Sequence, residues 1–276
     1  MNKNIDIVSD LHIDYWSDEL KDNIKFNCSI TKNYPLKWED KNIFNKILIV
    51  AGDISDNLDL SVKELDKISK YYDRVLFVDG NHEHLHIYPN LHSIDDIYDK
   101  INSLDNHKIK YLPKETFKLG RTAFIGCCGW WNYENKKPTE TEKHIKYFKK
   151  NFPELKAEDN FRNIENIYYK SVEEYNSLTK RLTELEKDKN ITEIIIVTHT
   201  LPRTFFSQGH IGTEFNTEFK NINKKNYPKL TKWIFGHTHA IYETKILESG
   251  IQFISNPRGR PSDYNRTNYQ IRFCNL

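Results

Sequence analysis

The chain has 276 residues and a mass of 32.9 kDa, enough for one large α/β domain with a sizeable core. Its 41 basic and 39 acidic residues leave a formal charge of +2, which permits nucleic-acid binding but gives no electrostatic argument for it. No run of about 18 apolar residues occurs, and the first residues lead directly into a strand-like stretch. We therefore expect a cytoplasmic protein without a signal peptide or a membrane span. The sequence does not indicate an oligomeric state.

Apolar, β-branched segments predict the strands. Four of them are almost continuous, as expected for strands covered on both faces, and lie at 5–10, 47–53, 74–82 and 193–199. Further strands are expected at 122–129, 232–237, 242–247 and 251–256. Between the second and third segments, residues 59–72 space Leu60, Leu65 and Ile68 at helical intervals, which predicts a crossover helix and a βαβ unit.

The stretch from about 131 to 188 differs from the strands because it is strongly charged and patterned for helices, at 139–152 and 161–188. We expect a helical insertion within a single domain that spans 1–276. A solvated flank is the simplest interpretation of this insertion, with a lid or a partner surface as the alternative. Residues 14–42 have no clear period and predict a long loop or a small insertion.

Side chains that can bind metal follow five of the predicted strands. In an open α/β sheet the carboxyl ends of the strands meet at one crevice, so residues far apart in the sequence come together there. Any one block is weak evidence, since a lone histidine is more often a satisfied core or surface residue. Their ordered occurrence, each after an apolar run, predicts a metal site. The blocks are Asp10-Leu11-His12, Gly52-Asp53, Gly80-Asn81-His82-Glu83, Thr198-His199 and Gly236-His237-Thr238-His239.

This arrangement resembles the calcineurin-like metallophosphoesterase superfamily, whose signature runs D-x-H, G-D, G-N-H-[DE], a lone His and G-H-x-H. The resemblance extends from Asp10 to His239. It implies an α/β fold, a four-layer αββα sandwich of two mixed β-sheets flanked by helices, with a dinuclear metal site at the strand ends. It also implies that Asp53 bridges the two ions. The remaining ligands would be Asp10, His12 and His239 at the first ion, and Asn81, His199 and His237 at the second.

The implied chemistry explains these residue types. Two divalent cations about 3.5 to 4 Å apart need an anionic bridge and neutral ligands that leave positions open for water and substrate. Oxygen and nitrogen ligands without a thiolate suit Mn, Fe or Zn, and the sequence does not choose among these metals. A hydroxide between the ions would attack the phosphorus of a phosphoester in line. His82 binds no metal in the family pattern and would act as the general acid for the leaving group.

The sequence says less about the substrate than about the metal site. The segment after Gly52 reads GDISDN, so the arginine of the protein Ser/Thr phosphatases is absent, and Asp56 stands where purple acid phosphatases carry a tyrosine. Downstream, SNPRGRP places Arg258 and Arg260 after a predicted strand, and we expect Arg258 to bind the substrate phosphate. With no arginine in the metal-binding blocks, we expect a phosphodiester substrate, because its single negative charge can be held largely by the metals.

Several alternatives remain open. His84 and His86 could contact substrate or a third ion, but a polar loop is the simpler interpretation. Trp130 and Trp131 could stack on a base or close the core. The other functions to weigh are a phosphomonoesterase or protein phosphatase, a nuclease of the DNA-repair branch, and a non-catalytic interaction scaffold. The full ligand set with His82 argues against a scaffold. The balanced charge, and the lack of a long extra domain after His239, argue against a nuclease.

Overall fold

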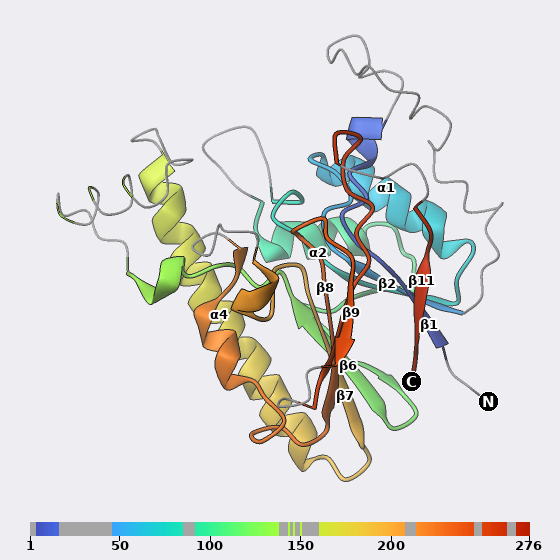
Figure 1. Ribbon diagram of the computed structural model, residues 1–276. Coiled ribbons are helices and arrows are strands. Elements are labelled where there is room, and N and C mark those ends of the chain that lie inside the picture. The colour runs from blue at the N-terminus through green and yellow to red at the C-terminus, as the bar shows by residue number, and fades with distance from the viewer. Residues whose placement is uncertain are drawn as a thin grey trace.

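The computed structural model describes residues 4–16, 46–84, 92–137, 160–207, 214–245, 250–263 and 269–276, together with Lys143, Lys146 and Lys150. These residues form two β-sheets with helices outside them (Figure 1). The first sheet has the order β11-β1-β2-β3-β4, with bounds Arg272–Asn275, Asn4–Val8, Ile47–Ala51, Arg74–Val78 and Ile109–Tyr111. The second has the order β5-β6-β7-β8-β10-β9, with bounds Phe117–Leu119, Thr122–Cys127, Glu193–Thr198, Leu230–Phe235, Gln252–Ser255 and Tyr242–Lys245.

Both sheets are mixed. Strands β1 to β4 run parallel to one another, and β11 pairs antiparallel with β1 at the edge of the first sheet. In the second sheet β6, β7, β8 and β10 are parallel, and the edge strands β5 and β9 are antiparallel. The predicted fold, a sandwich of two mixed sheets flanked by helices, is confirmed.

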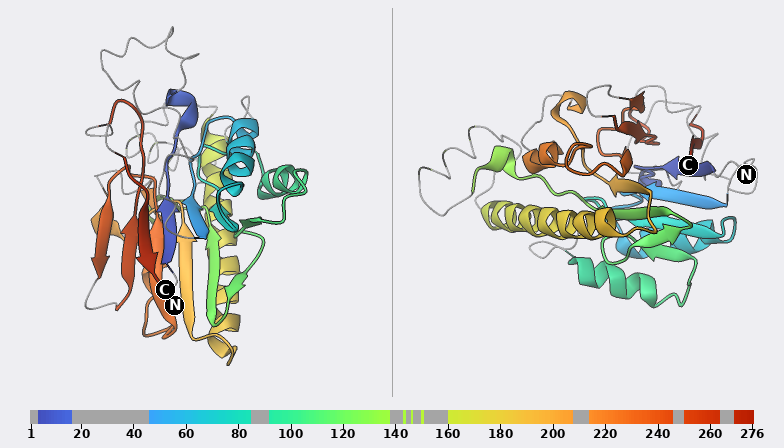
Figure 2. Two further views of the ribbon diagram at one scale, coloured as in Figure 1. Left: turned by 90° about the vertical axis from the view of Figure 1, so that its right-hand side faces the viewer. Right: turned by 90° about the horizontal axis from the view of Figure 1, so that it is seen from below.

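The continuous apolar strands are buried on both faces, as their sequences predict. Ile49 of β2 belongs to the core between the two sheets, where it shares a cluster with Leu76 of β3 and Val197 of β7. The next residue of β2, Val50, points to the opposite face and joins the cluster that contains α1, Leu58–Ser69, and α2, Ile94–Asn102. These two helices lie together on one flank of the strands (Figure 2).

Helix α1 confirms the predicted βαβ unit but corrects its buried face. The helix begins after Asn57, whose side chain accepts a hydrogen bond from the backbone N–H of Leu60. Leu60 was expected to face the core, yet it is 39% exposed. The reason is its place in the first turn, on the face opposite to the buried stripe of Leu58, Val62, Leu65 and Ile68.

Helix α4, Asn160–Lys187, confirms the helix predicted at 161–188. It is more than a solvated flank, because Leu178, Leu182 and Leu185 are buried against the second sheet. Figure 1 shows it running along β6 and β7. Most of the helix predicted at 139–152, and residues 17–42 of the predicted loop, lie outside the described residues.

The structure also contains elements that the sequence pattern did not predict, namely α2 and the short strands β4, β5 and β11. Four 3-10 turns complete the described elements, at Ile13–Trp16, Tyr133–Asn135, Thr204–Phe206 and Thr217–Asn221. Among the described residues, no helix combines the length and the apolar character that crossing a bilayer requires.

Candidate metal centre

The predicted ligands lie directly after the carboxyl ends of parallel strands, at one edge of the sandwich. The first sheet carries Asp10 and His12 after β1, Asp53 after β2, and Asn81 after β3. The second sheet carries His199 after β7, and His237 and His239 after β8. The structure brings six of these side chains, all except that of Asn81, together in two neighbouring groups.

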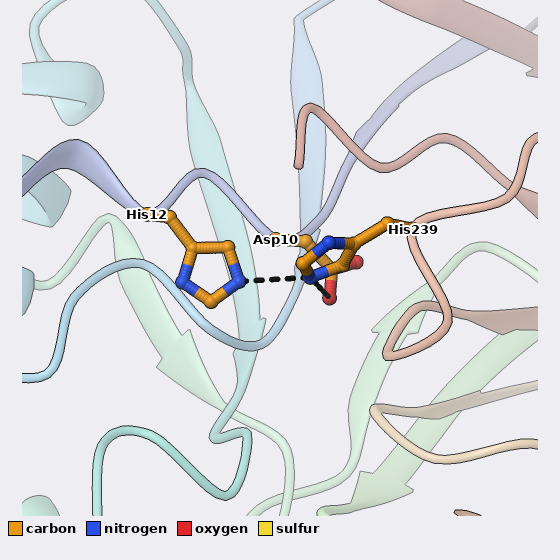
Figure 3. A group of neighbouring side chains, drawn as sticks. All are labelled: Asp10, His12 and His239. Carbon is orange, nitrogen blue, oxygen red and sulfur yellow. Dashed lines mark hydrogen bonds and ion pairs between the residues drawn. The ribbon is translucent and has the colours of Figure 1, made fainter. Parts of the chain in front are cut away.

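The first group consists of Asp10, His12 and His239, whose ligand atoms all lie within 4.8 Å of one another. Their side chains turn toward a common point, and His239 enters from the loop of the other sheet (Figure 3). The Nε2 atoms of His12 and His239 are 3.0 Å apart, and Nε2 of His239 lies 3.6 Å from Oδ1 of Asp10. Two imidazole nitrogens and one carboxylate oxygen converging in this way could hold a cation.

The second group consists of Asp53, His199 and His237. Nε2 of His199 lies 3.0 Å from Oδ2 of Asp53 and 3.2 Å from Nδ1 of His237. The other ring nitrogen of His199 donates to the carbonyl of Ala51 at 2.9 Å, which directs Nε2 toward Asp53. Oδ2 of Asp53 also lies 3.9 Å from Nε2 of His12, so this carboxylate stands between the two groups.

Asn81 provides an independent test of whether the site fits metal ions. Its side-chain oxygen is buried, and the structure gives it no hydrogen-bond partner. A buried amide oxygen without a partner is destabilising unless a ligand satisfies it. An amide oxygen of this kind can coordinate a divalent cation. The residues present therefore fit the pair of ions that the sequence implies.

The backbone at the strand ends is held in the left-handed region. Asp10, His12, Asp53, His237 and His239 have φ between 42° and 76°, which non-glycine residues rarely adopt. Each such residue costs about 1–3 kcal/mol and persists only where its surroundings fix it. Five of the seven predicted ligands share this conformation, which aims their side chains into the site.

The glycines of the motifs permit the close approach of the ligand loops. A Cβ atom on Gly80 would lie 2.0 Å from Oδ1 of Asp53, and one on Gly236 would lie 2.5 Å from Oδ2 of Asp10. Neither position can carry a larger residue without moving a predicted ligand. The G-N-H and G-H-x-H patterns therefore include glycine for a steric reason.

Glu83 fixes the loop that carries Asp53. It is fully buried, and its carboxylate accepts backbone hydrogen bonds from Asp53 at 2.9 Å, Ile54 at 2.7 Å and Gly80 at 2.7 Å. The hydroxyl of Ser61 in α1 donates to the same carboxylate at 3.0 Å. The sequence motif contained Glu83, but its anchoring role was not predicted.

His82, the predicted general acid, lies at the rim of the second group. Its backbone N–H donates to Oδ1 of Asp53 at 3.0 Å, and its Nε2 lies 3.7 Å from Oδ2 of Asp53. Its Nδ1 contacts Oδ1 of Asp56 at 2.5 Å. Burial and the guanidinium of Arg260 lower the pKa of His82, but the carboxylates of Asp53 and Asp56 outweigh both and raise the pKa to about 9.

His12 and Asp53 have the charge states that metal binding needs, whereas His199 must lose a proton. Burial lowers the pKa of His199, but the carboxylates of Asp53 and Asp10 outweigh burial and raise the pKa to about 10. Burial lowers the pKa of His12 to about 3, so its imidazole is neutral. Burial alone would raise the pKa of Asp53, but the neighbouring imidazoles of His199 and His82 hold it well below its usual value. Asp53 is therefore an ionised carboxylate.

The two arginines of SNPRGRP occupy different places. Arg258 is 1% exposed, and its guanidinium lies over the ring of Trp16 at 4.1 Å. The arginine that contacts the site is Arg260, whose Nη2 lies 3.1 Å from Nε2 of His82. The same loop supplies Asp263, whose carboxylate contacts Nδ1 of His239 at 2.5 Å. Sequence reasoning missed Asp263, because nothing in the local pattern links it to His239.

The remaining candidates are only partly within the described residues. His84 is buried, and both its ring nitrogens are engaged, by Asp79 at 2.5 Å and by the carbonyl of His92 at 2.6 Å. His86 lies outside the described residues. Trp130 is 2% exposed and belongs to the interior, whereas the half-buried ring of Trp131 lies 5.9 Å from that of His237.

Solved structures of other proteins share this fold. Phosphopantetheinyl hydrolase from Mycobacterium tuberculosis matches with a TM-score of 0.68 and 16% identity, covering 99% of this chain and 96% of that chain. A dimetal phosphatase from Danio rerio matches with a TM-score of 0.57 and 16% identity, covering 99% of this chain and 92% of that chain. At this identity the two structures show the shared fold.

Sequence comparison identifies the family to which the chain belongs. An uncharacterized protein of Acanthamoeba polyphaga mimivirus is 28% identical over 278 residues, which cover 95% of this chain and 92% of that protein. The model of the calcineurin-like phosphoesterase family matches residues 3–240 and so includes every predicted ligand from Asp10 to His239. The chain belongs to the calcineurin-like phosphoesterase family, and with it to the metal-dependent enzymes that hydrolyse phosphoesters.

Proposed function

We propose that this protein hydrolyses a phosphoester with two divalent ions held at the strand ends. The observation that carries the proposal is the position of the Asp53 carboxylate, whose Oδ2 lies 3.0 Å from His199 of one group and 3.9 Å from His12 of the other. Asp53 would bridge the ions. The first ion would be held by Asp10, His12 and His239, and the second by Asn81, His199 and His237.

The nature of the ions follows from the ligands. When bound, two divalent ions lower the pKa of water and act as Lewis acids toward phosphate. The oxygen and nitrogen ligands suit Mn, Fe or Zn. The choice among these metals and a cytoplasmic location remain predictions from the sequence.

His82 would protonate the leaving oxygen. Asp56 accepts from its Nδ1, which orients the ring and leaves Nε2 directed toward Asp53 and the site. Tyr15 donates to the second oxygen of Asp56 at 2.8 Å and so fixes the carboxylate that orients His82. These three side chains form one connected set beside the candidate metal ligands.

The type of ester is the finer question. The diester preference expected from the sequence depended on the lack of an arginine in the metal-binding blocks, with Arg258 expected to hold the phosphate. Arg260 stands outside those blocks but lies 3.1 Å from His82, so the fold does bring an arginine to the candidate site. This contact favours a phosphomonoester as the substrate and makes Arg260, rather than the buried Arg258, the candidate for binding the phosphate.

Two other functions have distinct consequences. A non-catalytic scaffold of this fold need not bind two ions, so elemental analysis of the purified protein would identify it. A nuclease would bind single- or double-stranded DNA with an affinity that falls steeply as salt rises. Neither reading accounts for the orientation of His82 by Asp56 toward the candidate ligands.

The proposal is tested by replacing Asp53, the proposed bridge between the two ions. Asp53→Asn should lose bound metal, measured by elemental analysis, together with phosphoesterase activity. Asp59→Asn is the matched control, because Asp59 is exposed in the first turn of α1 and should leave both quantities unchanged. Two ions per chain in Asp53→Asn at the wild-type level would overturn the assignment.

A further inference from the structure

Arg260 is the cation that the fold presents to the candidate general acid. It follows β10 in the chain and does not belong to any of the five metal-binding blocks. Its Nη2 lies 3.1 Å from Nε2 of His82, and its guanidinium lies over the ring of Tyr15 at 4.7 Å. Its backbone N–H donates to Asp263 at 2.7 Å, and Asp263 in turn contacts His239. The loop of Arg260 is thus tied to a predicted metal ligand.

The guanidinium of Arg260 forms no ion pair with the described residues. Within the part of the chain that the structure describes, no carboxylate forms an ion pair with it, and its Nε is buried without an acceptor. A guanidinium is always charged and carries five N–H donors. The Nε–H of Arg260, which has no acceptor, is a donor available to an anion bound beside His82.

Two other partly buried arginines show how this protein satisfies a guanidinium that has only a structural role. Arg181 donates to the carbonyls of Leu112 at 2.8 Å and Glu115 at 2.7 Å. Arg203 donates to the carbonyls of Phe219 at 2.9 Å and Ile222 at 2.6 Å. The only contact of the Arg260 side chain to a polar atom among the described residues is with His82, which faces the site.

The position of Arg260 bears on the class of ester. A phosphomonoester dianion carries one more negative charge on its terminal oxygens than a phosphodiester, and a guanidinium fork matches two such oxygens. The guanidinium has only N–H donors, so its contact with Nε2 belongs to the neutral form of His82. When Nε2 carries the proton for the leaving oxygen, Nη2 can no longer donate to it and would donate to the phosphate bound beside it. A diester would bring a second, uncharged ester oxygen to the same donors and gain less.

We propose that Arg260 binds the phosphate of a phosphomonoester and makes this protein select monoesters over diesters. The inference rests on the proposed function, because it assumes that the phosphate binds between His82 and the candidate metal ligands. Tyr15 supports the face of the guanidinium, and Asp263 holds its backbone.

The test compares wild type with Arg260→Ala and Arg260→Lys, all loaded with Mn²⁺. The measured quantities are kcat/KM for p-nitrophenyl phosphate and for bis-p-nitrophenyl phosphate, and the affinity for inorganic phosphate by calorimetry. Wild type should prefer the monoester. Arg260→Ala should lower monoester kcat/KM and phosphate affinity by about 10- to 100-fold, the range of a charge-assisted contact, with a change of less than about threefold on the diester. Arg260→Lys should recover only part of the loss, because an ammonium lacks the planar fork.

The controls separate this inference from the proposed function. Arg272→Ala removes an arginine from the edge strand β11 and should leave all three quantities unchanged. Metal content and circular dichroism of the Arg260 variants should match wild type. A diester preference in wild type, equal losses on both esters, or unchanged phosphate affinity in Arg260→Ala would overturn the role of Arg260. A fully metal-loaded wild type that hydrolyses neither ester would contradict the proposed function, and phosphate affinity would then still decide whether Arg260 binds phosphate.

Discussion

Oδ1 of Asp56 lies 2.5 Å from Nδ1 of His82, although 26 residues separate them in the chain. Asp56 follows β2 and His82 follows β3, and these parallel neighbours bring the two side chains to the same edge. The contact fixes the orientation of the imidazole and raises its basicity. In its proposed role as general acid, His82 would therefore be oriented before the substrate binds.

Removing the imidazole of His82 tests its proposed role as general acid. His82→Ala should keep its metal ions but lose about 10²- to 10⁴-fold in kcat on an alkyl phosphate, whose alkoxide leaving group needs a proton. The loss should be smaller with p-nitrophenyl phosphate, since p-nitrophenolate leaves without protonation. Steady-state kinetics on both substrates checks this. Equal losses would assign His82 to substrate positioning instead.

Removing the carboxylate of Asp56, the partner of His82, should move the pH profile of activity. A general acid is active while protonated, so activity falls as pH rises through its pKa. Burial lowers the pKa of His82 and the carboxylates of Asp53 and Asp56 raise it. Asp56→Asn removes one of these charges, so the pKa should fall and the alkaline limb of kcat/KM should shift to lower pH. Asp59→Asn, at an exposed position, should not move the limb. An unshifted limb in Asp56→Asn would mean that another group controls it.

Glu83, which anchors the loop that carries Asp53, should contribute to the free energy of unfolding. In Glu83→Gln the amide NH₂ would face backbone N–H donors that now point at a carboxylate oxygen. These donors are either those of Asp53 and Gly80 or those of Ile54 and Ser55. We expect the free energy of unfolding to fall by about 3 kcal/mol, the scale of unsatisfied buried donors. Urea denaturation of the metal-free protein measures this free energy of unfolding. Glu173→Gln, the same change at an exposed position of α4, should cost about 0.5 kcal/mol or less, and a similarly small loss in Glu83→Gln would refute the anchoring role.

The long apolar strands and the metal motifs could be predicted from the sequence because each is a local pattern. Strand β2 is five consecutive buried residues, and the β-branched, apolar run ILIVA followed by Gly52 favours a buried strand. The short strands β4, β5 and β11 were missed for the opposite reason. Phe117–Leu119 and Arg272–Asn275 are partly exposed at sheet edges, and pairing with a neighbouring strand, rather than local pattern, defines them.

The supporting residues of the site were harder to predict than its ligands. Asp263 and Arg260 lie more than 20 residues beyond His239, and only the return of the chain along β10 brings them to the site. Arg258 and Arg260 are two residues apart, and their side chains lie in the interior and in the site, respectively. Local sequence does not distinguish the two, which flank a turn at Gly259 with φ of 76°.

The distribution of ligands between the two sheets has a mechanical consequence. Asp10 and His12 come from the first sheet and His239 from the second, while the other group joins Asp53 to His199 and His237 in the same way. Each bound ion would thus be a cross-link between the two halves of the sandwich, at the end where loops rather than apolar side chains meet. Ion binding would then add to the free energy that keeps the sheets in register, and a sliding motion of one sheet over the other would require breaking coordination bonds.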